Sequence, residues 1–220
     1  MNNEEIVKTF KLNYLFENAL IPVNRRKIIP LYIDKDGSDR DAFKCLKEFE
    51  IEIKLSDSNF ITRGENIYIH STITGNGKSS WALRLIQAYF NKIYPYCKLE
   101  CKALFINVPQ FLLAIKDNIS NFNEYAEHIK ENVYTADLVV WDDIGNKTIT
   151  QFEADNLLAI IDARMNKGKS NIYTSNLNNE ELHEALGDRL TSRIINTSYD
   201  IEFKGADKRR LIVNDTKSSN

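Results

Sequence analysis

Cysteine is scarce in this sequence of 220 residues, with one residue each at Cys45, Cys97 and Cys101. None of the three has the Cys-x-x-Cys spacing that structural zinc sites and thioredoxin-like redox sites favour. The sequence therefore gives no support for a zinc site or a catalytic redox pair. We expect three reduced, partly buried thiols.

Long apolar runs are also absent, because no stretch approaches the ~20 residues that span a bilayer. The first residues, Met1 to Glu5, lack the basic flank and apolar core of a secretion signal. These absences predict a cytoplasmic protein with no membrane partner. The net charge of −2 gives no general attraction for nucleic acid, so any DNA contact must come from a local basic patch.

The composition is that of an ordinary globular protein, with 43% hydrophobic and 27% charged residues. Its length suits one principal domain with a full α/β core, and we find no repeat or low-complexity tract. Residues 1–20 have helix-compatible apolar spacing, which Pro22 ends. We therefore predict a short helical N-terminal segment over 1–20 and one principal domain over 21–220.

From Asn66 onward, segments of strand pattern alternate with segments of helix pattern. Short apolar runs of the kind found in central parallel strands are followed by stretches with apolar residues at i, i+4 and i+8. This alternation predicts an α/β fold in which helices flank a parallel sheet on both faces. The expected strands are 67–70, 103–106, 138–141 and 171–174, and the expected helices are 41–49, 78–93, 111–119, 125–133 and 152–165.

A glycine-rich loop joins the first of these strands to its helix. The run Thr72-Ile73-Thr74-Gly75-Asn76-Gly77-Lys78-Ser79 matches the phosphate-binding pattern Gly-x-x-x-x-Gly-Lys-Ser/Thr at every position except the first. Gly75 and Gly77 permit positive φ and close backbone approach. Lys78 can reach the β- and γ-phosphates and Ser79 can ligate Mg²⁺. The alternative is a turn that merely joins strand to helix.

Paired carboxylates follow the buried strand Leu138-Val139-Val140-Trp141. Asp142 and Asp143 thus stand at the strand end where the acid that faces Mg²⁺ is needed. Asp142 would hold the metal through water, and Asp143 would orient or deprotonate the attacking water. Together with the loop, these carboxylates favour an ATP- and Mg²⁺-dependent site over a structural turn.

The order and spacing of several motifs resemble the DnaC/DnaI type of AAA+ helicase loader, with IstB-like transposition ATPases as close relatives. The resemblance covers about residues 60–213. It implies an AAA+ P-loop core with a parallel five-stranded sheet. The motifs are Gly75-Asn76-Gly77-Lys78-Ser79, Val140-Trp141-Asp142-Asp143-Ile144-Gly145, Tyr173-Thr174-Ser175-Asn176-Leu177, Gly187-Asp188-Arg189-Leu190-Thr191-Ser192-Arg193-Ile194 and Gly205-Ala206-Asp207-Lys208-Arg209-Arg210.

The resemblance also implies roles for single residues. Asn176 would be sensor 1, which senses the γ-phosphate, although a turn or capping role is the alternative. Arg193 would be an arginine finger acting on ATP of a neighbouring subunit, and Arg209 would be sensor 2. A surface salt bridge is the alternative for both arginines, and Arg189 and Arg210 compete for these assignments. The predicted sets are Asp143, Asn176 and Arg193 for catalysis, Ser79 and Asp142 for metal, and Gly75, Asn76, Gly77, Lys78, Ser79, Ser80 and Arg209 for nucleotide.

The chain also departs from the family pattern. Loaders of this type often carry a longer N-terminal helicase-binding domain, whereas about 60 residues precede the phosphate-loop strand here, without a zinc-ligand cluster. This fits a compact phage or prophage version. Family members use a helical insertion after the second strand to contact single-stranded DNA, and residues 108–125 occupy that place. Lys116, Phe122 and Tyr125 are candidate contacts there, and both aromatic residues also suit a core or rim position.

The resemblance implies a protein that assembles through its ATPase interface on a replicative hexameric helicase and helps to place it on single-stranded DNA during initiation of replication. An IstB-like transposition ATPase that coats duplex DNA is an alternative. A nucleotide-switched binding module with little turnover is another, because Asp143 stands where many AAA+ proteins have glutamate. A small-molecule kinase is disfavoured, since Asn176 and Arg193 lie where an oligomeric AAA+ site needs them.

Overall fold

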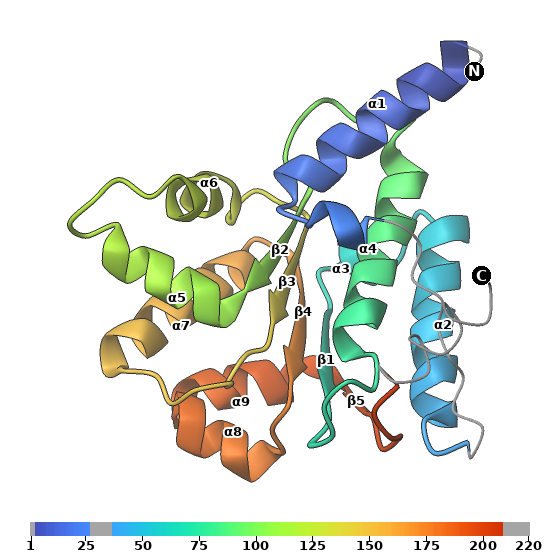
Figure 1. Ribbon diagram of the computed structural model, residues 1–220. Helices are drawn as coiled ribbons and strands as arrows, with labels where there is room; N and C mark the ends of the chain where they lie inside the picture. The colour runs from blue at the N-terminus through green and yellow to red at the C-terminus, as the bar shows by residue number, and fades with distance from the viewer. Residues whose placement is uncertain (1–2, 27–36, 209–220) are drawn as a thin grey trace, which may run out of the picture.

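The computed structural model describes residues 3–26 and 37–208 (Figure 1). Its centre is one sheet of five parallel strands in the order β2-β3-β4-β1-β5. The predicted fold class, an α/β P-loop core with a parallel five-stranded sheet, is therefore confirmed. The strands are β1 (Asn66–His70), β2 (Ala103–Asn107), β3 (Leu138–Asp142), β4 (Ser170–Ser175) and β5 (Ser198–Glu202).

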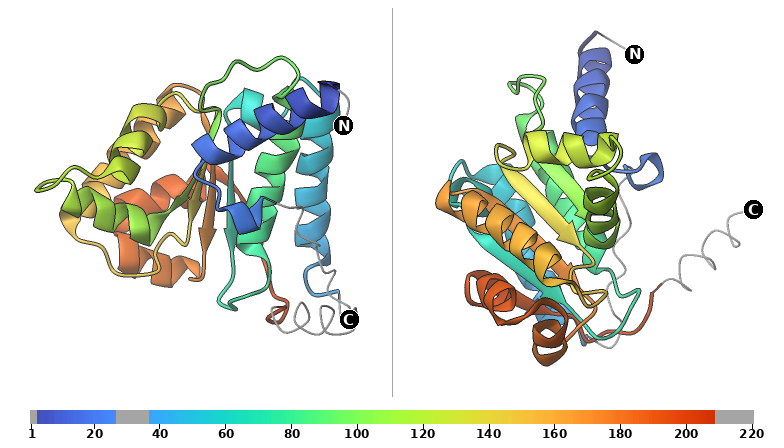
Figure 2. Two further views of the ribbon diagram at one scale, coloured as in Figure 1. Left: turned by 45° about the horizontal axis from the view of Figure 1, so that its top comes forward. Right: turned by 90° about the vertical axis from the view of Figure 1, so that its left-hand side faces the viewer.

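Helices cover both faces of the sheet, as Figures 1 and 2 show. Alternate residues of each strand point to opposite faces. Ile67 and Ile69 therefore join one apolar core and Tyr68 joins the other. The first core is covered by α1 (Asn3–Asn18), α2 (Arg40–Leu55), α3 (Phe60–Arg63) and α4 (Lys78–Ile93). The second is covered by α5 (Val108–Asp117), α6 (Glu124–Asn132), α7 (Gln151–Asn166), α8 (Asn179–Leu186) and α9 (Asp188–Asn196).

The N-terminal helix α1 has its buried residues in its C-terminal half. Leu15 and Phe16 are buried, and the Phe16 ring meets Phe90 of α4 edge to face at 5.4 Å. Ile6 and Phe10 belong to the same helix-compatible apolar spacing as Leu15, but both are exposed. The helix itself agrees with the sequence, whereas the division of the chain after residue 20 stays a prediction. Among the described residues, no helix is long and apolar enough to cross a membrane.

A fully buried arginine ties the beginnings of β3 and β4 to the helices that cover them. The guanidinium of Arg164, on α7, donates to the carbonyl oxygens of Val133, Ala136 and Ser170 and to the side-chain oxygen of Asn171. Burial lowers its pKa to about 10, so it stays charged at neutral pH. Because these acceptors come from four separate positions, one side chain fixes the amino ends of both strands.

We predict that Arg164→Met strongly destabilises the fold. The shorter apolar side chain would remove a donor from four buried oxygen acceptors, of which Asn171 Oδ1 keeps the Trp141 indole N–H. Each acceptor left unpaired costs about 1–3 kcal/mol before relaxation. Urea titration should show a loss of at least about 3 kcal/mol in the free energy of unfolding. Asp155→Ala, on the exposed face of the same helix, should change it by less than about 0.5 kcal/mol. Similar values for the two variants would contradict this role of Arg164.

Candidate functional site

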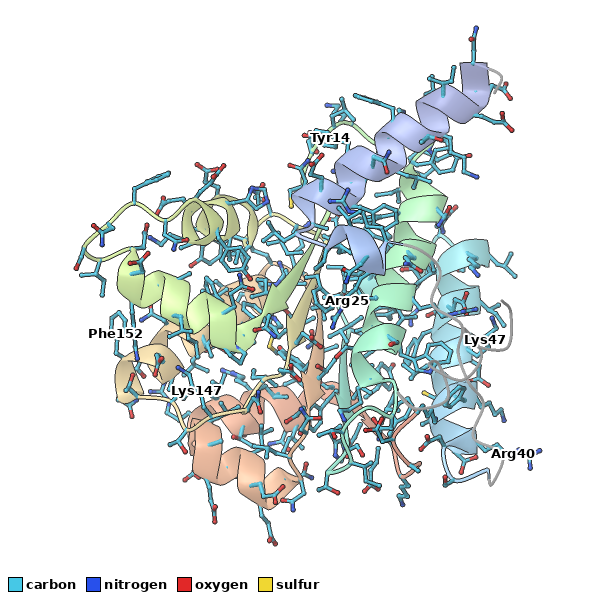
Figure 3. All side chains as sticks on the ribbon, viewed as in Figure 1. Tyr14, Arg25, Arg40, Lys47, Lys147 and Phe152 are labelled. Carbon is cyan, nitrogen blue, oxygen red and sulfur yellow. The ribbon has the colours of Figure 1, made fainter. Side chains whose placement is uncertain are left out.

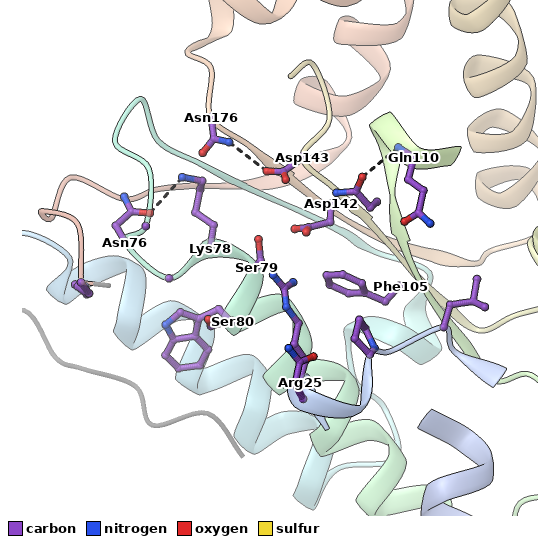
Figure 4. Close-up of a pocket in the computed structure, with 18 of the residues that line it drawn as sticks. Arg25, Asn76, Lys78, Ser79, Ser80, Phe105, Gln110, Asp142, Asp143 and Asn176 are labelled. Carbon is purple, nitrogen blue, oxygen red and sulfur yellow. Dashed lines mark hydrogen bonds between the residues drawn. The ribbon is translucent and has the colours of Figure 1, made fainter. Parts of the chain in front are cut away.

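The carboxyl ends of β1, β3 and β4 meet at one edge of the sheet, because the three strands are parallel and in register. A cavity of about 730 Å³ opens at this edge (Figure 4), a volume typical of small-molecule sites. The structure thus brings together residues predicted from three separate motifs. The predicted residues that line the cavity are Gly75, Asn76, Gly77, Lys78, Ser79, Ser80, Asp142, Asp143 and Asn176.

The loop between β1 and α4 has the conformation that phosphate binding requires. Gly75 and Gly77 have positive φ angles of 75° and 110°. The buried ammonium of Lys78 donates to the Ile73 carbonyl at 3.0 Å and to the Asn76 side-chain oxygen at 3.2 Å. The loop therefore surrounds a cation at the N-terminus of α4, where helix dipole and backbone N–H groups favour an anion. Thr72, at the first glycine position of the pattern, does not have positive φ, so its backbone does not require glycine.

The segment after β5 packs against this loop. The Lys208 N–H donates to the Gly75 carbonyl at 3.0 Å, and a Cβ added to Gly75 would lie 2.1 Å from a carboxylate oxygen of Asp207. The Lys208 ammonium lines the cavity and forms an ion pair of 2.8 Å with the buried Asp39. Lys208 is a cavity residue that sequence reasoning missed. Arg209, the predicted sensor 2, lies outside the described residues.

Asp142 ends β3 inside the molecule, where 3% of its surface is exposed. Burial raises the pKa of its carboxyl, while hydrogen bonds from Ser79 and Thr174 oppose that rise. The Thr174 hydroxyl donates to Asp142 Oδ1 at 2.7 Å. A buried carboxylate with a raised pKa is one that a cation would stabilise.

The donor set around Asp142 fits Mg²⁺ rather than a metal held by the protein alone. Ser79 and Asp142 supply hard oxygen atoms that lie within hydrogen-bond contact of each other. The described residues contain no cluster of three or more His, Cys, Asp or Glu side chains that could hold a metal. Mg²⁺ commonly takes one or two protein oxygens and completes its shell with water and substrate phosphates. The arrangement therefore suits an ion that arrives with a nucleotide.

Asp143 is turned toward Asn176 by an unusual backbone conformation. Its φ is 59°, in the left-handed region that aspartate tolerates better than most residues. Its N–H donates to the Thr174 hydroxyl at 3.0 Å, and its carboxylate accepts from the Asn176 amide at 3.2 Å. Asn176 does not cap the following helix, because Asn178 does so. Thr174 thus links both acids, a role that the sequence motif did not assign.

Arg193 lies away from the cavity in its own chain. It stands on the exposed side of α9 and forms an ion pair of 2.6 Å with Asp162 of α7. Arg189 and Arg193 both line a depression on the surface between α7 and α9. Within one chain, the surface salt bridge is therefore the observed state of Arg193. A role on the nucleotide would require a second copy.

The residues proposed for DNA contact lie partly at the surface and partly in the cavity. Phe122, between α5 and α6, is 81% exposed. Lys116 forms an ion pair of 3.1 Å with Glu153 in the first turn of α7, next to Phe152, which Figure 3 labels. Tyr125 instead lines the nucleotide-sized cavity, where burial raises its pKa to about 12. Of the two aromatic candidates, Phe122 is thus the one available at the surface.

Comparison with known proteins gives the family. The model of the family described as IstB-like ATP binding protein matches residues 46–210, which is most of the chain. The replicative helicase loader DnaC of Escherichia coli K12 is 28% identical over 127 residues, which cover 58% of this chain and 49% of that protein. The DnaC of Buchnera aphidicola subsp. Schizaphis graminum is 26% identical over 164 residues, covering 74% and 60%.

Solved structures agree at the level of the fold. The crystal structure of the DnaC helicase loader superposes with a TM-score of 0.61 at 20% identity, covering 79% of this chain and 94% of that one. The chain spans less than two thirds of the length of either curated relative. The phosphate loop, the paired acids and the matching family model lead to one conclusion: the chain belongs to the family of IstB-like ATP binding proteins, the AAA+ P-loop ATPases that include DnaC-type helicase loaders.

Proposed function

We propose that this protein is an ATP-dependent helicase loader, which binds a replicative hexameric helicase and single-stranded DNA during initiation of DNA replication. The observation that carries the proposal is the hydrogen-bonded pair of Asp143 and Asn176 beside the phosphate loop, in a chain whose curated relatives are replicative helicase loaders. In this proposal the pair would position the water molecule that attacks the γ-phosphate. Binding and hydrolysis of ATP would then control assembly on the helicase.

Each group of the site would have a separate task. The loop and Lys78 would bind the phosphates, while Ser79 and Asp142 would hold Mg²⁺, which neutralises charge on the β- and γ-phosphates. Asp143 would accept a proton from the attacking water, and Asn176 would orient that carboxylate. Arg193 would act only from a second copy, since it lies outside the cavity of its own chain. Self-assembly would therefore precede fast hydrolysis.

Two other functions share this site. The description of the matching family favours an IstB-like transposition ATPase as the second candidate. It would bind duplex DNA, whereas a loader prefers single strands. A nucleotide-switched binding module would retain ATP with little turnover, because Asp143 is shorter than the glutamate common in AAA+ proteins.

The two adjacent acids should fail in different ways when each is replaced by asparagine. Asp142→Asn removes the charge next to Ser79, so Mg²⁺-dependent ATP affinity should fall by about 10- to 100-fold. Asp143→Asn should keep ATP bound and lower the hydrolysis rate by at least about 100-fold, because the base is lost. Calorimetric titration and a phosphate-release assay measure the two effects. Equal loss of ATP affinity in both variants would mean that the roles are misassigned.

Association with the helicase tests the function itself. The purified chain and the hexameric helicase of the same organism should co-elute in size-exclusion chromatography when ATP and Mg²⁺ are present, and separate when ATP is omitted. Lys78→Ala is the control, because a protein that cannot bind ATP should lose the difference between the two conditions.

Fluorescence anisotropy with labelled oligonucleotides separates the loader from the second candidate. Binding to single strands should be salt-sensitive and stronger with ATP, because only local basic and aromatic contacts are available on a chain of net charge −2. Preference for duplex DNA together with no helicase association would contradict the loader and support the transposition ATPase.

A further inference from the structure

The basic turn after the N-terminal helix reaches the nucleotide cavity. A short 3₁₀ helix, η1 (Val23–Arg25), follows α1. Pro22, Asn24 and Arg25 line the cavity, although they lie about fifty residues before the phosphate loop. In Figure 4 the side chain of Arg25 extends from η1 toward Ser79 and Asp142. An arginine from outside the recognised motifs therefore faces the metal side of the site.

The backbone of Arg25 is fixed to the helix that carries the phosphate-binding residues. The buried side chain of Gln87, on α4, donates to the carbonyl oxygens of Arg25 and Arg26 at 3.4 Å each. Arg26 Nε in turn donates to the Ile21 carbonyl at 2.9 Å. Because α4 begins with Lys78 and Ser79, η1 and the phosphate loop are held on one rigid element. The exposed Arg25 side chain extends from this anchored position.

Three cationic side chains line the cavity in the described part of the chain, and Arg25 is the one whose role is open. Among the described residues, the cationic side chains that line the cavity are Arg25, Lys78 and Lys208. Lys208 is paired with Asp39, and Lys78 lies within the loop. A triphosphate with one Mg²⁺ keeps net negative charge, and Asp142 and Asp143 add to it. A further cation on the metal side would therefore stabilise the bound nucleotide.

The Arg25 guanidinium would face the phosphate oxygens of a nucleotide bound in this cavity. A planar guanidinium can form two parallel hydrogen bonds to a phosphate, which the lysine ammonium cannot.

We propose that Arg25 binds the phosphate chain of ATP at its β- and γ-oxygens, on the side of Ser79 opposite to Lys78. This inference rests on the ATP-dependent function proposed above and adds a binding residue to it. Arg25 would bind in the same chain, unlike Arg193. The nucleotide would thereby gain a direct contact with the segment that joins α1 to the ATPase core.

The test is a calorimetric titration of the full chain with ATP, ADP and AMP in the presence of Mg²⁺. Arg25→Gln should weaken ATP binding about tenfold and ADP binding less, because the lost contact includes the γ-phosphate. Arg25→Lys should recover only part of the loss. The matched control is Arg40→Gln, an exposed arginine of α2 outside the cavity, which should bind as the wild type does.

The control titrations separate failure of this inference from failure of the ATP site. If the wild type binds ATP, Lys78→Ala does not, and Arg25→Gln binds as tightly as the wild type, the role of Arg25 is refuted and the ATP site stands. An equal loss for ATP, ADP and AMP would also refute it, because the contact would not involve the terminal phosphates. If the wild type itself binds no ATP, the proposed function fails first. Thermal unfolding of Arg25→Gln should match the wild type, since the side chain is exposed.

Discussion

Hydrogen bonds at both ends of β3 and β4 hold the two strands in the alignment on which the site depends. At the amino ends, Arg164 donates to Ser170 and Asn171 of β4 and to the carbonyl oxygens of Val133 and Ala136, which lie between α6 and β3. At the carboxyl ends, the Thr174 hydroxyl donates to Asp142 and accepts from the Asp143 N–H. A shift of one residue between these strands would turn every side chain to the other face of the sheet. The two acids keep their distinct positions because this shift is prevented.

The same alignment explains the electrostatics of the cavity. Asp142 is buried and turned toward Ser79, whereas Asp143 adopts a left-handed backbone and faces Asn176. Two neighbouring residues thus receive different environments, one suited to a metal ion and one to a water molecule. Lys78 is held by oxygen atoms of its own loop, which phosphate oxygens can replace. The site is therefore organised before a nucleotide enters, which lowers the cost of binding.

The sequence predicts the phosphate loop and the paired acids because each combines a local pattern with a neighbouring apolar strand. The sequence does not locate strand β5, because this strand lies at the sheet edge and only Ile201 of its five residues is buried, so its apolar pattern is weak. The sequence does not predict that Thr174 links the two acids, because threonine is common in strands for reasons unrelated to function. Arg25 and Lys208 reach the cavity through tertiary contacts with α4 and the phosphate loop, which no local spacing reveals.

Fast hydrolysis, in the proposed function, needs Arg193 of a second copy, because the cavity of one chain lacks this charge. The decisive measurement is the ATPase rate of two inactive variants, Arg193→Ala and Lys78→Ala, alone and mixed. One mixed interface would combine the intact phosphate loop of the first with Arg193 of the second. We expect each variant alone to be nearly inactive and the mixture to recover a substantial fraction of wild-type activity. No recovery under conditions where wild-type subunits assemble would contradict action of Arg193 between subunits.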